Sequence, residues 1–313
     1  LANGNILVVW LDVDLKGKII DSQGNHISED LTLMTPTGTH NTLSKINVTA
    51  NASGGFLVSL RENVSSSEQN HLLQKFDNNG NALSELIQIN ESNINSDARI
   101  ELFDDGSSLV IFDQKINDNY VICAQKFDED LTKVGAATQL NSALNTQKFP
   151  ASAKLVSGEI MVVYVSQDES TWNTTGVYAQ KVGSNGSAIG SAVLVNTNTL
   201  QNQTMPVISA LSNGGYVIAW ESNHELDGWY YTNNIYAQVY DADGNKVGVE
   251  TMVNTTIPET QRDIAISSFD DGGYIITWTS EKTVGNNHVI YGQRFDNDGN
   301  KVGTEIDFYN EQP

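Results

Sequence analysis

Residues 205–220 read MPVISALSNGGYVIAW, and residues 234–245 read NIYAQVYDADGN. Both segments contain short runs rich in Val, Ile and Tyr that end at turns of Gly, Asn, Ser or Asp, which is the pattern of β-strands joined by tight turns. With the final run ETMVN at 250–254, this unit predicts four consecutive short strands. We therefore expect it to fold as one small antiparallel sheet.

Two parts of this unit recur along the chain in a fixed order. The first part is a turn with glycine followed by an apolar run, and its copies lie at 4–10 (GNILVVW), 54–60 (GGFLVSL), 106–112 (GSSLVIF), 158–164 (GEIMVVY), 214–220 (GGYVIAW) and 272–278 (GGYIITW). The second part is a strand-like run that ends in a polar turn, and its copies start at Lys18, Gln74, Gln125, Gln180, Gln238 and Gln293. The glycines that open the first part are 50, 52, 52, 56 and 58 residues apart, so the chain contains six copies of one repeat.

Six units of four short strands predict an all-β chain that folds as a six-bladed β-propeller of four-stranded antiparallel blades. The expected units of this single repeat domain are 1–40, 41–92, 93–145, 146–200, 201–258 and 259–313. Leu1 falls at the last position of a first strand, so we expect the innermost strand of the first blade upstream of it. An open arc of a larger propeller and a β-solenoid are the alternatives.

The charge of the chain limits its partners. Its 38 Asp and Glu residues outnumber its 17 Lys and Arg residues, which gives a formal net charge of −21. Such a surface repels phosphate backbones and anionic lipid, so we expect no nucleic acid partner. No apolar run approaches the roughly 20 residues of a membrane-spanning helix, so we expect no membrane insertion.

The repeat pattern GGYVIAW at 214–220, followed by IYAQVYDADGNKVG at 235–248 and VN at 253–254, resembles a repeat of very large bacterial proteins. These are secreted and surface proteins, notably adhesins and RTX-type calcium-binding proteins. The resemblance spans all six units and is close in the fifth and sixth. It implies extracellular or cell-surface display, flanking domains in a larger chain, and adhesion or ligand binding without a reaction.

Three repeated positions favour a structural role. The residue that ends the first part of the repeat is usually aromatic, as at Trp220 and Trp278, and we expect it to pack between blades. The glutamine that opens the second part stands inside an apolar strand, so we expect its amide to bond neighbouring backbone and to fix the register of the blade. The single cysteine, Cys123, stands where other copies have Tyr, which predicts a buried and inert thiol.

Several aromatic residues fall outside the repeat pattern, in loops between second and third strands. Such loops open on one face of a propeller, so an exposed cluster there could stack on a sugar or anchor a protein partner. The alternative is that these side chains fold back onto the sheet edge. The candidate ligand-binding residues are Trp172, Asp227, Trp229, Tyr230 and Tyr231.

The turns that follow third strands resemble the beginning of a calcium loop. Two of them, DADGN and DNDGN, place two aspartates two residues apart beside a glycine and an asparagine. The same residues are good hairpin-turn formers, so a turn without a metal is the alternative. No cofactor is certain, and the candidate calcium ligands are Asp241, Asp243, Asn245, Asp296, Asp298 and Asn300.

No catalytic motif stands out. The five histidines are scattered, and the chain contains no HExxH, P-loop or GxSxG sequence. We therefore expect no enzyme, but a non-enzymatic extracellular adhesion or recognition module of a larger surface or secreted protein, bound to a surface glycan or a protein partner. The first alternative is a glycan-binding lectin, and the second is a propeller hydrolase with a channel-facing site.

Overall fold

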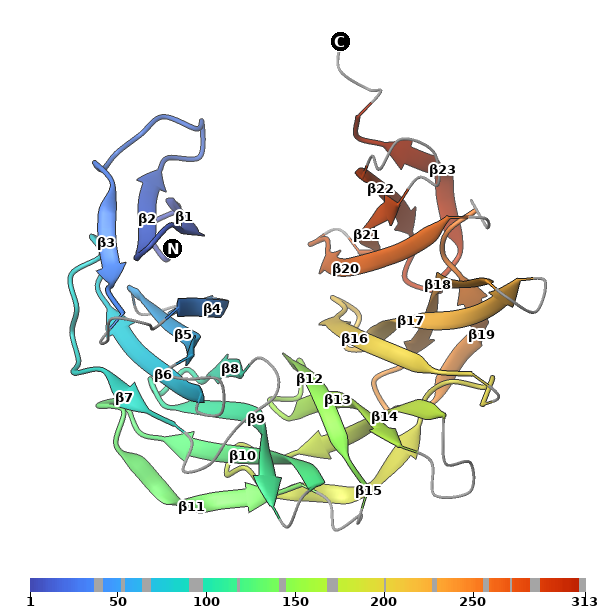
Figure 1. Cartoon of the computed structure of the whole chain (residues 1–313), viewed down its shortest axis with the longest axis horizontal. Coiled ribbons are helices and arrows are strands. Elements are labelled where there is room, and N and C mark those ends of the chain that lie inside the picture. Colours follow the sequence, from blue (N-terminus) through green and yellow to red (C-terminus); the bar gives the residue numbers. More distant parts are fainter. Residues whose placement is uncertain are drawn as a thin grey trace. The chain divides into compact units, whose positions relative to one another are not determined.

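The computed structural model describes thirteen segments of the chain: 1–36, 42–51, 54–63, 69–89, 98–116, 119–140, 145–167, 174–199, 201–226, 230–255, 259–270, 272–281 and 288–309. Every regular element in these segments is a β-strand, and the strands form six antiparallel sheets (Figure 1). The chain is all-β and has the fold of a six-bladed β-propeller, as the repeat predicts. A β-solenoid is excluded, because the described strands of each sheet pair with antiparallel neighbours.

The strands follow one another within each sheet. Sheet 1 contains β1 (Ile6–Leu11), β2 (Leu15–Ile20) and β3 (Leu31–Met34); sheet 2 contains β4 (Thr42–Ala50), β5 (Phe56–Asn63), β6 (Gln69–Phe76) and β7 (Ile87–Gln88); sheet 3 contains β8 (Arg99–Leu102), β9 (Ser108–Ile116), β10 (Asn119–Phe127) and β11 (Lys133–Gln139). Sheet 4 contains β12 (Gln147–Lys154), β13 (Ile160–Gln167), β14 (Thr175–Val182) and β15 (Ala188–Leu194); sheet 5 contains β16 (Gln203–Ala210), β17 (Tyr216–Leu226), β18 (Tyr230–Tyr240) and β19 (Lys246–Met252); sheet 6 contains β20 (Thr260–Ser268), β21 (Tyr274–Glu281), β22 (His288–Phe295) and β23 (Lys301–Asp307).

Sheet 1 differs from the other five sheets in its number of strands. Five sheets have four strands each, whereas the described part of sheet 1 has three. Its first strand, β1, contains the apolar run of the first copy, GNILVVW. In every other sheet the corresponding run forms the second strand. The described residues of sheet 1 therefore match the second, third and fourth strands of the repeat.

The chain divides into two compact units. The first unit comprises Leu1–Ser142 with Ser184–Ser187 and holds sheets 1 to 3. The second unit comprises Ala143–Gly183 with Ala188–Pro313 and holds sheets 4 to 6.

Apolar side chains of neighbouring sheets form the cores of each unit. In the second unit, one cluster joins Val163 of sheet 4 to Trp220 of sheet 5, and another joins Val217 of sheet 5 to Trp278 of sheet 6. Trp220 is fully buried and Trp278 is 2% exposed, so the predicted packing role of this position is confirmed. Burial of these large aromatic side chains, together with the aliphatic side chains around them, stabilises the contact between sheets.

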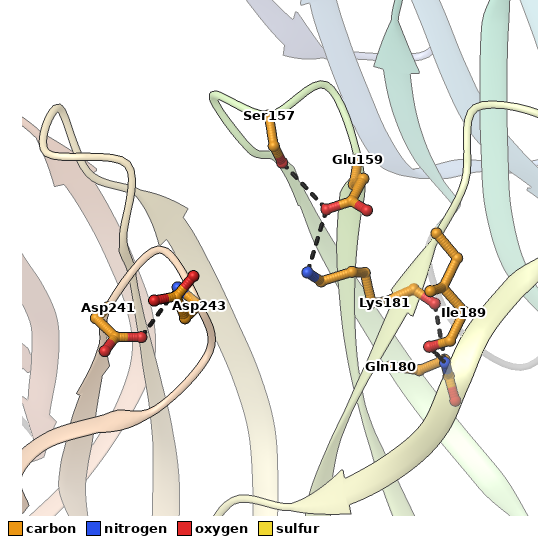
Figure 2. Close-up of polar contacts among 7 residues, drawn as sticks. All are labelled: Ser157, Glu159, Gln180, Lys181, Ile189, Asp241 and Asp243. Carbon is orange, nitrogen blue, oxygen red and sulfur yellow. Dashed lines mark hydrogen bonds and ion pairs between the residues drawn. The ribbon is translucent and has the colours of Figure 1, made fainter.

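Glycine and glutamine fix the turns and the register of each sheet. A Cβ atom at Gly215 would collide with the carbonyl oxygen of Tyr240 on the next strand, so the GG turn keeps its second glycine. Gln180 donates from Nε2 to the carbonyl oxygens of Lys181, at 2.9 Å, and Ile189, at 3.0 Å (Figure 2). Gln238 and Gln293 repeat this contact in their own sheets, which confirms the predicted role of the repeated glutamine.

Candidate functional site

The first strand of four sheets contains the same β-bulge. In each case two residues of the first strand stand opposite one residue of the second strand, which bends the strand locally. The first bulge residue has a positive φ, and these residues are Lys45 (56°), Phe149 (55°), Met205 (49°) and Asp263 (56°). The repeat thus presents one side chain per sheet from an unusual backbone conformation.

The bulge of sheet 6 is bound by a glutamate of sheet 5. Glu221 follows Trp220 on β17 and is only 5% exposed. Its Oε1 accepts a hydrogen bond from the backbone N–H of Asp263 at 3.2 Å. Its Oε2 accepts a hydrogen bond from Nδ2 of Asn233, on β18, at 3.0 Å. The carboxyl group of Glu221 is therefore held between two sheets of the second unit.

Burial makes Glu221 an unusual acid. Loss of hydration raises the pKa of its carboxyl group to about 7, and the carboxyl group of Asp263 acts in the same direction. The two hydrogen bonds and the nearby Arg262 guanidinium lower this pKa, but burial has the larger effect. Glu221 therefore retains a proton close to neutral pH, as a general acid requires.

Asp263 supplies a second, accessible carboxyl group beside Glu221. Its side chain is 68% exposed, and its Oδ2 lies 3.9 Å from Nε of Arg262. The Arg262 guanidinium also pairs with Glu281 on β21. A buried carboxyl group that holds a proton, bound to the backbone of a residue with an exposed carboxyl group, is an arrangement suited to general acid–base chemistry.

The sequence analysis missed this pair, although the repeat contained a signal for Glu221. The position after the aromatic residue follows an apolar run inside a buried strand, where a carboxylate is unexpected. Across the six units this position is occupied by Leu11, Arg61, Asp113, Val165, Glu221 and Thr279. Such variation within a repeat that otherwise keeps its pattern marks a position where the copies differ in role.

The predicted aromatic ligand site is only partly described. Trp172, Asp227 and Trp229 lie outside the described residues. Tyr230 and Tyr231 lie in β18 and pair with Leu226 and Glu225 of β17, but their side chains are outside the described part. They belong to the same hairpin as Glu221, whose own partner on β18 is Ile235. The ligand role of these five residues stays a prediction.

The predicted calcium turns form closed hydrogen-bond networks. Oδ1 of Asp241 accepts a bond from the backbone N–H of Asp243 at 3.0 Å (Figure 2). It also accepts one from the backbone N–H of Asn245 at 2.8 Å. Its Oδ2 accepts a bond from Nδ2 of Asn245 at 3.0 Å. Asp296 makes the same contacts with Asp298 and Asn300. The first aspartate of each turn thus stabilises the turn itself.

The described residues contain no group of three or more His, Cys, Asp or Glu side chains placed to hold a metal ion. Cys123 is buried, and burial together with the nearby Asp113 raises the pKa of its thiol to about 12, which confirms the predicted inert thiol. No helix with the length and hydropathy of a membrane span occurs in the described part of the chain.

Solved structures share the fold of this chain. An α-L-arabinanase of Penicillium chrysogenum, solved with arabinobiose, is 15% identical with a TM-score of 0.55 and covers 95% of this chain and 91% of its own. A GH93 α-L-arabinofuranosidase of Fusarium graminearum, also solved with arabinobiose, is 11% identical with a TM-score of 0.53 and covers 80% and 88%. A protein of unknown function from Dyadobacter fermentans is 10% identical with a TM-score of 0.61 and covers 87% and 84%. No protein-family model and no curated protein sequence matches this chain.

These neighbours correct the functional expectation. Those with a stated activity are mainly glycoside hydrolases, which contradicts both the non-enzymatic adhesion or recognition module and the expectation of no enzyme. They agree better with the second alternative, a propeller hydrolase. The candidate carboxyl groups of Glu221 and Asp263 come from different sheets, 42 residues apart, and form no linear motif that a sequence search would find.

Proposed function

We propose that this protein hydrolyses glycosidic bonds, with Glu221 as the general acid and Asp263 as the general base. The observation that carries the proposal is the buried, hydrogen-bonded carboxyl group of Glu221, whose pKa burial raises to about 7, beside the exposed carboxyl group of Asp263. Glycoside hydrolysis uses two such carboxyl groups in different protonation states. The fold shared with glycoside hydrolases supports the same class of reaction.

The proposed reaction consumes one water molecule. Glu221 transfers its proton to the glycosidic oxygen, and the bond between this oxygen and the anomeric carbon breaks. Water adds to the anomeric carbon while its proton passes to Asp263, and solvent then returns the proton to Glu221. The N–H of Asp263 and the amide of Asn233 hold the Glu221 carboxyl group in place. Arg262 limits the accumulation of negative charge around Asp263.

A polymeric glycan is the proposed substrate, which places the protein outside the cell or at its surface. The resemblance of the repeat to secreted and surface proteins supports this location and flanking domains in a larger chain. Arabinan and arabinobiose are the first substrates to test, because two structures of similar fold are an α-L-arabinanase and an α-L-arabinofuranosidase, both solved with arabinobiose.

The test is hydrolysis of linear arabinan, arabinobiose and an aryl arabinofuranoside by the purified chain, with products separated by anion-exchange chromatography. We expect Glu221→Gln and Asp263→Asn each to lower kcat/KM by about 10²–10⁴-fold. Loss of one acid–base group removes about 10²–10⁴-fold of catalysis. The control is Glu159→Gln, which removes a carboxylate that binds Ser157 and Lys181 in sheet 4 (Figure 2). Equal activity of Glu221→Gln and Glu159→Gln would overturn the proposal.

Calcium at the Asp241 and Asp296 turns remains a separate proposal. Two carboxylates per turn, with carbonyl groups and water, would give a weak site of the kind found in extracellular modules, with Kd of roughly 10⁻⁴–10⁻³ M. The test compares thermal unfolding in millimolar calcium, magnesium and EGTA. A calcium-specific rise in Tm that disappears in Asp243→Ala/Asp298→Ala supports the site, and the absence of such a rise contradicts it.

A further inference from the structure

Three bulge residues of the second unit stand on neighbouring first strands. Phe149, Met205 and Asp263 each occupy the first bulge position of their strand, opposite Tyr164, Trp220 and Trp278 respectively. The strand β12 contacts β16, and β16 contacts β20. The three bulges therefore form a row across three sheets, and this row ends at the carboxyl pair of Asp263 and Glu221.

The backbone at these positions does not favour large side chains. A positive φ is rare for bulky residues and carries a conformational cost that glycine does not have. None of the four described bulges has glycine at this position, although the chain uses glycine at many other positions with positive φ. In the described residues, the one other non-glycine residue with positive φ is Leu131, in a turn. Backbone strain of this kind persists only where the surrounding structure holds it, and it is concentrated at active and ligand-binding sites.

Their chemistry suits an oligosaccharide. Met205 is 39% exposed, the Asp263 side chain is 68% exposed, and Phe149 is half-buried. An aromatic ring and a thioether can pack against the apolar faces of sugar rings, while a carboxylate accepts hydrogen bonds from sugar hydroxyl groups. The row thus offers two apolar contacts followed by a polar one.

The charges near the row indicate which sugars it can bind. Glu221, Asp263 and Glu281 surround a single arginine, Arg262, and the whole chain carries a net charge of −21. Bringing a uronic acid or a sulfated sugar to these carboxyl groups would be opposed by charge repulsion. The site therefore favours a neutral glycan.

We propose that Phe149, Met205 and Asp263 form a binding row for consecutive units of a neutral oligosaccharide. Phe149 and Met205 hold the units next to the one that reacts between Glu221 and Asp263. The position of the reacting unit rests on the proposed hydrolase function, but binding along the row does not.

The test measures binding by isothermal titration calorimetry in the Glu221→Gln variant, which holds the ligand without cleaving it. The probes are arabinohexaose, xylohexaose and cellohexaose, with hexagalacturonate as the anionic comparison. We expect Phe149→Ala and Met205→Ala each to raise the Kd of the best neutral ligand about tenfold. We expect hexagalacturonate to bind at least tenfold more weakly than that ligand. Lys45→Ala, at the same bulge position of the first unit, is the matched control and should leave this Kd unchanged.

Two further variants separate binding from folding. Phe149→Gly and Met205→Gly suit the positive φ, so they should not lower the Tm of the parent but should still lose about tenfold in affinity. Equal affinity of the parent and the Phe149 and Met205 variants, or absence of binding to all three neutral hexasaccharides, overturns the binding row. Binding with the expected variant pattern, in a chain whose wild type cleaves none of these ligands, supports the row and overturns the hydrolase proposal.

Discussion

Sheets 2, 5 and 6 each contain a β-bulge of the same kind. The residues compared below are positively charged in sheet 2 and acidic in sheets 5 and 6. In sheet 2 the position after the repeated large residue is Arg61, and the bulge residue is Lys45. The position after the repeated large residue is Glu221 in sheet 5, and the bulge residue is Asp263 in sheet 6. The strand order and the bulge are the same in both places. The repeat therefore supplies the framework, and a few residues that differ between copies supply the chemistry.

Burial favours the uncharged form of one titratable side chain in each region, His71 in sheet 2 and Glu221 in sheet 5. His71 lies opposite Arg61, and burial, with Arg61 and Arg99 nearby, lowers its pKa to about 3. Burial raises the pKa of Glu221 to about 7. Both shifts favour the neutral form, as loss of hydration requires. At neutral pH, His71 is therefore uncharged and fixed, whereas Glu221 is close to its titration midpoint and able to exchange a proton.

The largest expected change in stability comes from replacing Glu221 with arginine, the residue type found at this repeat position in sheet 2. Glu221→Arg places a second positive charge beside Arg262 and removes the acceptor for the Asp263 N–H. We expect the free energy of unfolding to fall by about 3–5 kcal/mol, as for other unpaired buried charges. Thr279→Arg at the same repeat position of sheet 6 is the control, because Thr279 is only partly buried. Equal losses in urea unfolding of the two variants would contradict a special environment at Glu221.

A second prediction concerns the pH dependence of stability. The pKa of Glu221 rises from an ordinary 4.5 to about 7 on folding, so the folded state holds a proton that the unfolded state has released between these pH values. The free energy of unfolding should therefore fall as pH rises through this window, by about 3 kcal/mol in total. Glu221→Gln should lack this decrease, so the variant gains stability relative to wild type from pH 5 to pH 8.

The control for this prediction is a carboxyl group with the opposite shift. Hydrogen bonds from Asn245 lower the pKa of Asp241, so its contribution is present above the ordinary aspartate pKa and is lost as pH falls. Asp241→Asn should therefore differ from wild type mainly at higher pH, with a loss rather than a gain of stability. If Asp241→Asn and Glu221→Gln changed the free energy of unfolding in the same direction, the environments assigned to these two carboxyl groups would be contradicted.

A smaller effect tests the framework that the copies share. Trp278 donates from Nε1 to Oε1 of Gln261 at 2.9 Å, and both side chains are buried. Gln261→Leu leaves this indole N–H without its acceptor, which should cost about 1–3 kcal/mol in urea unfolding. The double variant Trp278→Phe/Gln261→Leu removes both polar groups, so the penalty for Gln261→Leu should be smaller in the Trp278→Phe background. An equal penalty in both backgrounds would show that this bond contributes nothing specific.

The smallest expected effect concerns the bulge itself. Met205→Gly relieves the strain of a positive φ, which outweighs the added flexibility of glycine, so we expect a gain of about 1 kcal/mol in unfolding free energy. Thr204→Gly, one residue earlier on β16 and outside the positive-φ set, should lose stability instead. Destabilisation by both variants would mean that the Met205 backbone is unstrained.

Sequence patterns predicted the fold well because each part of the repeat has a local cause. The GG turn and the repeated glutamine follow from contacts within one sheet, such as that between Gln180 and Ile189. The apolar second strand follows from the packing of one sheet against the next, which is the same in every copy. The acid pair was not predicted, because Glu221 and Asp263 meet only where one sheet contacts the next. The bulge at Met205 was equally hidden, since its positive φ is unusual for methionine. A residue-by-residue alignment of the six copies would have marked this position as variable, but it would not have singled out Glu221, because Arg61 and Asp113 are charged there as well.

The proposed role of Glu221 as the general acid depends most directly on the proton that its carboxyl group holds. ¹³C NMR of protein labelled at the glutamate carboxyl carbon measures its pKa, and the Glu221→Gln variant assigns the resonance by its absence. We predict a titration midpoint near pH 7 for Glu221 in the folded protein. A midpoint near the ordinary 4.5 would mean that Glu221 is a charged carboxylate at neutral pH, and it would contradict its role as the general acid.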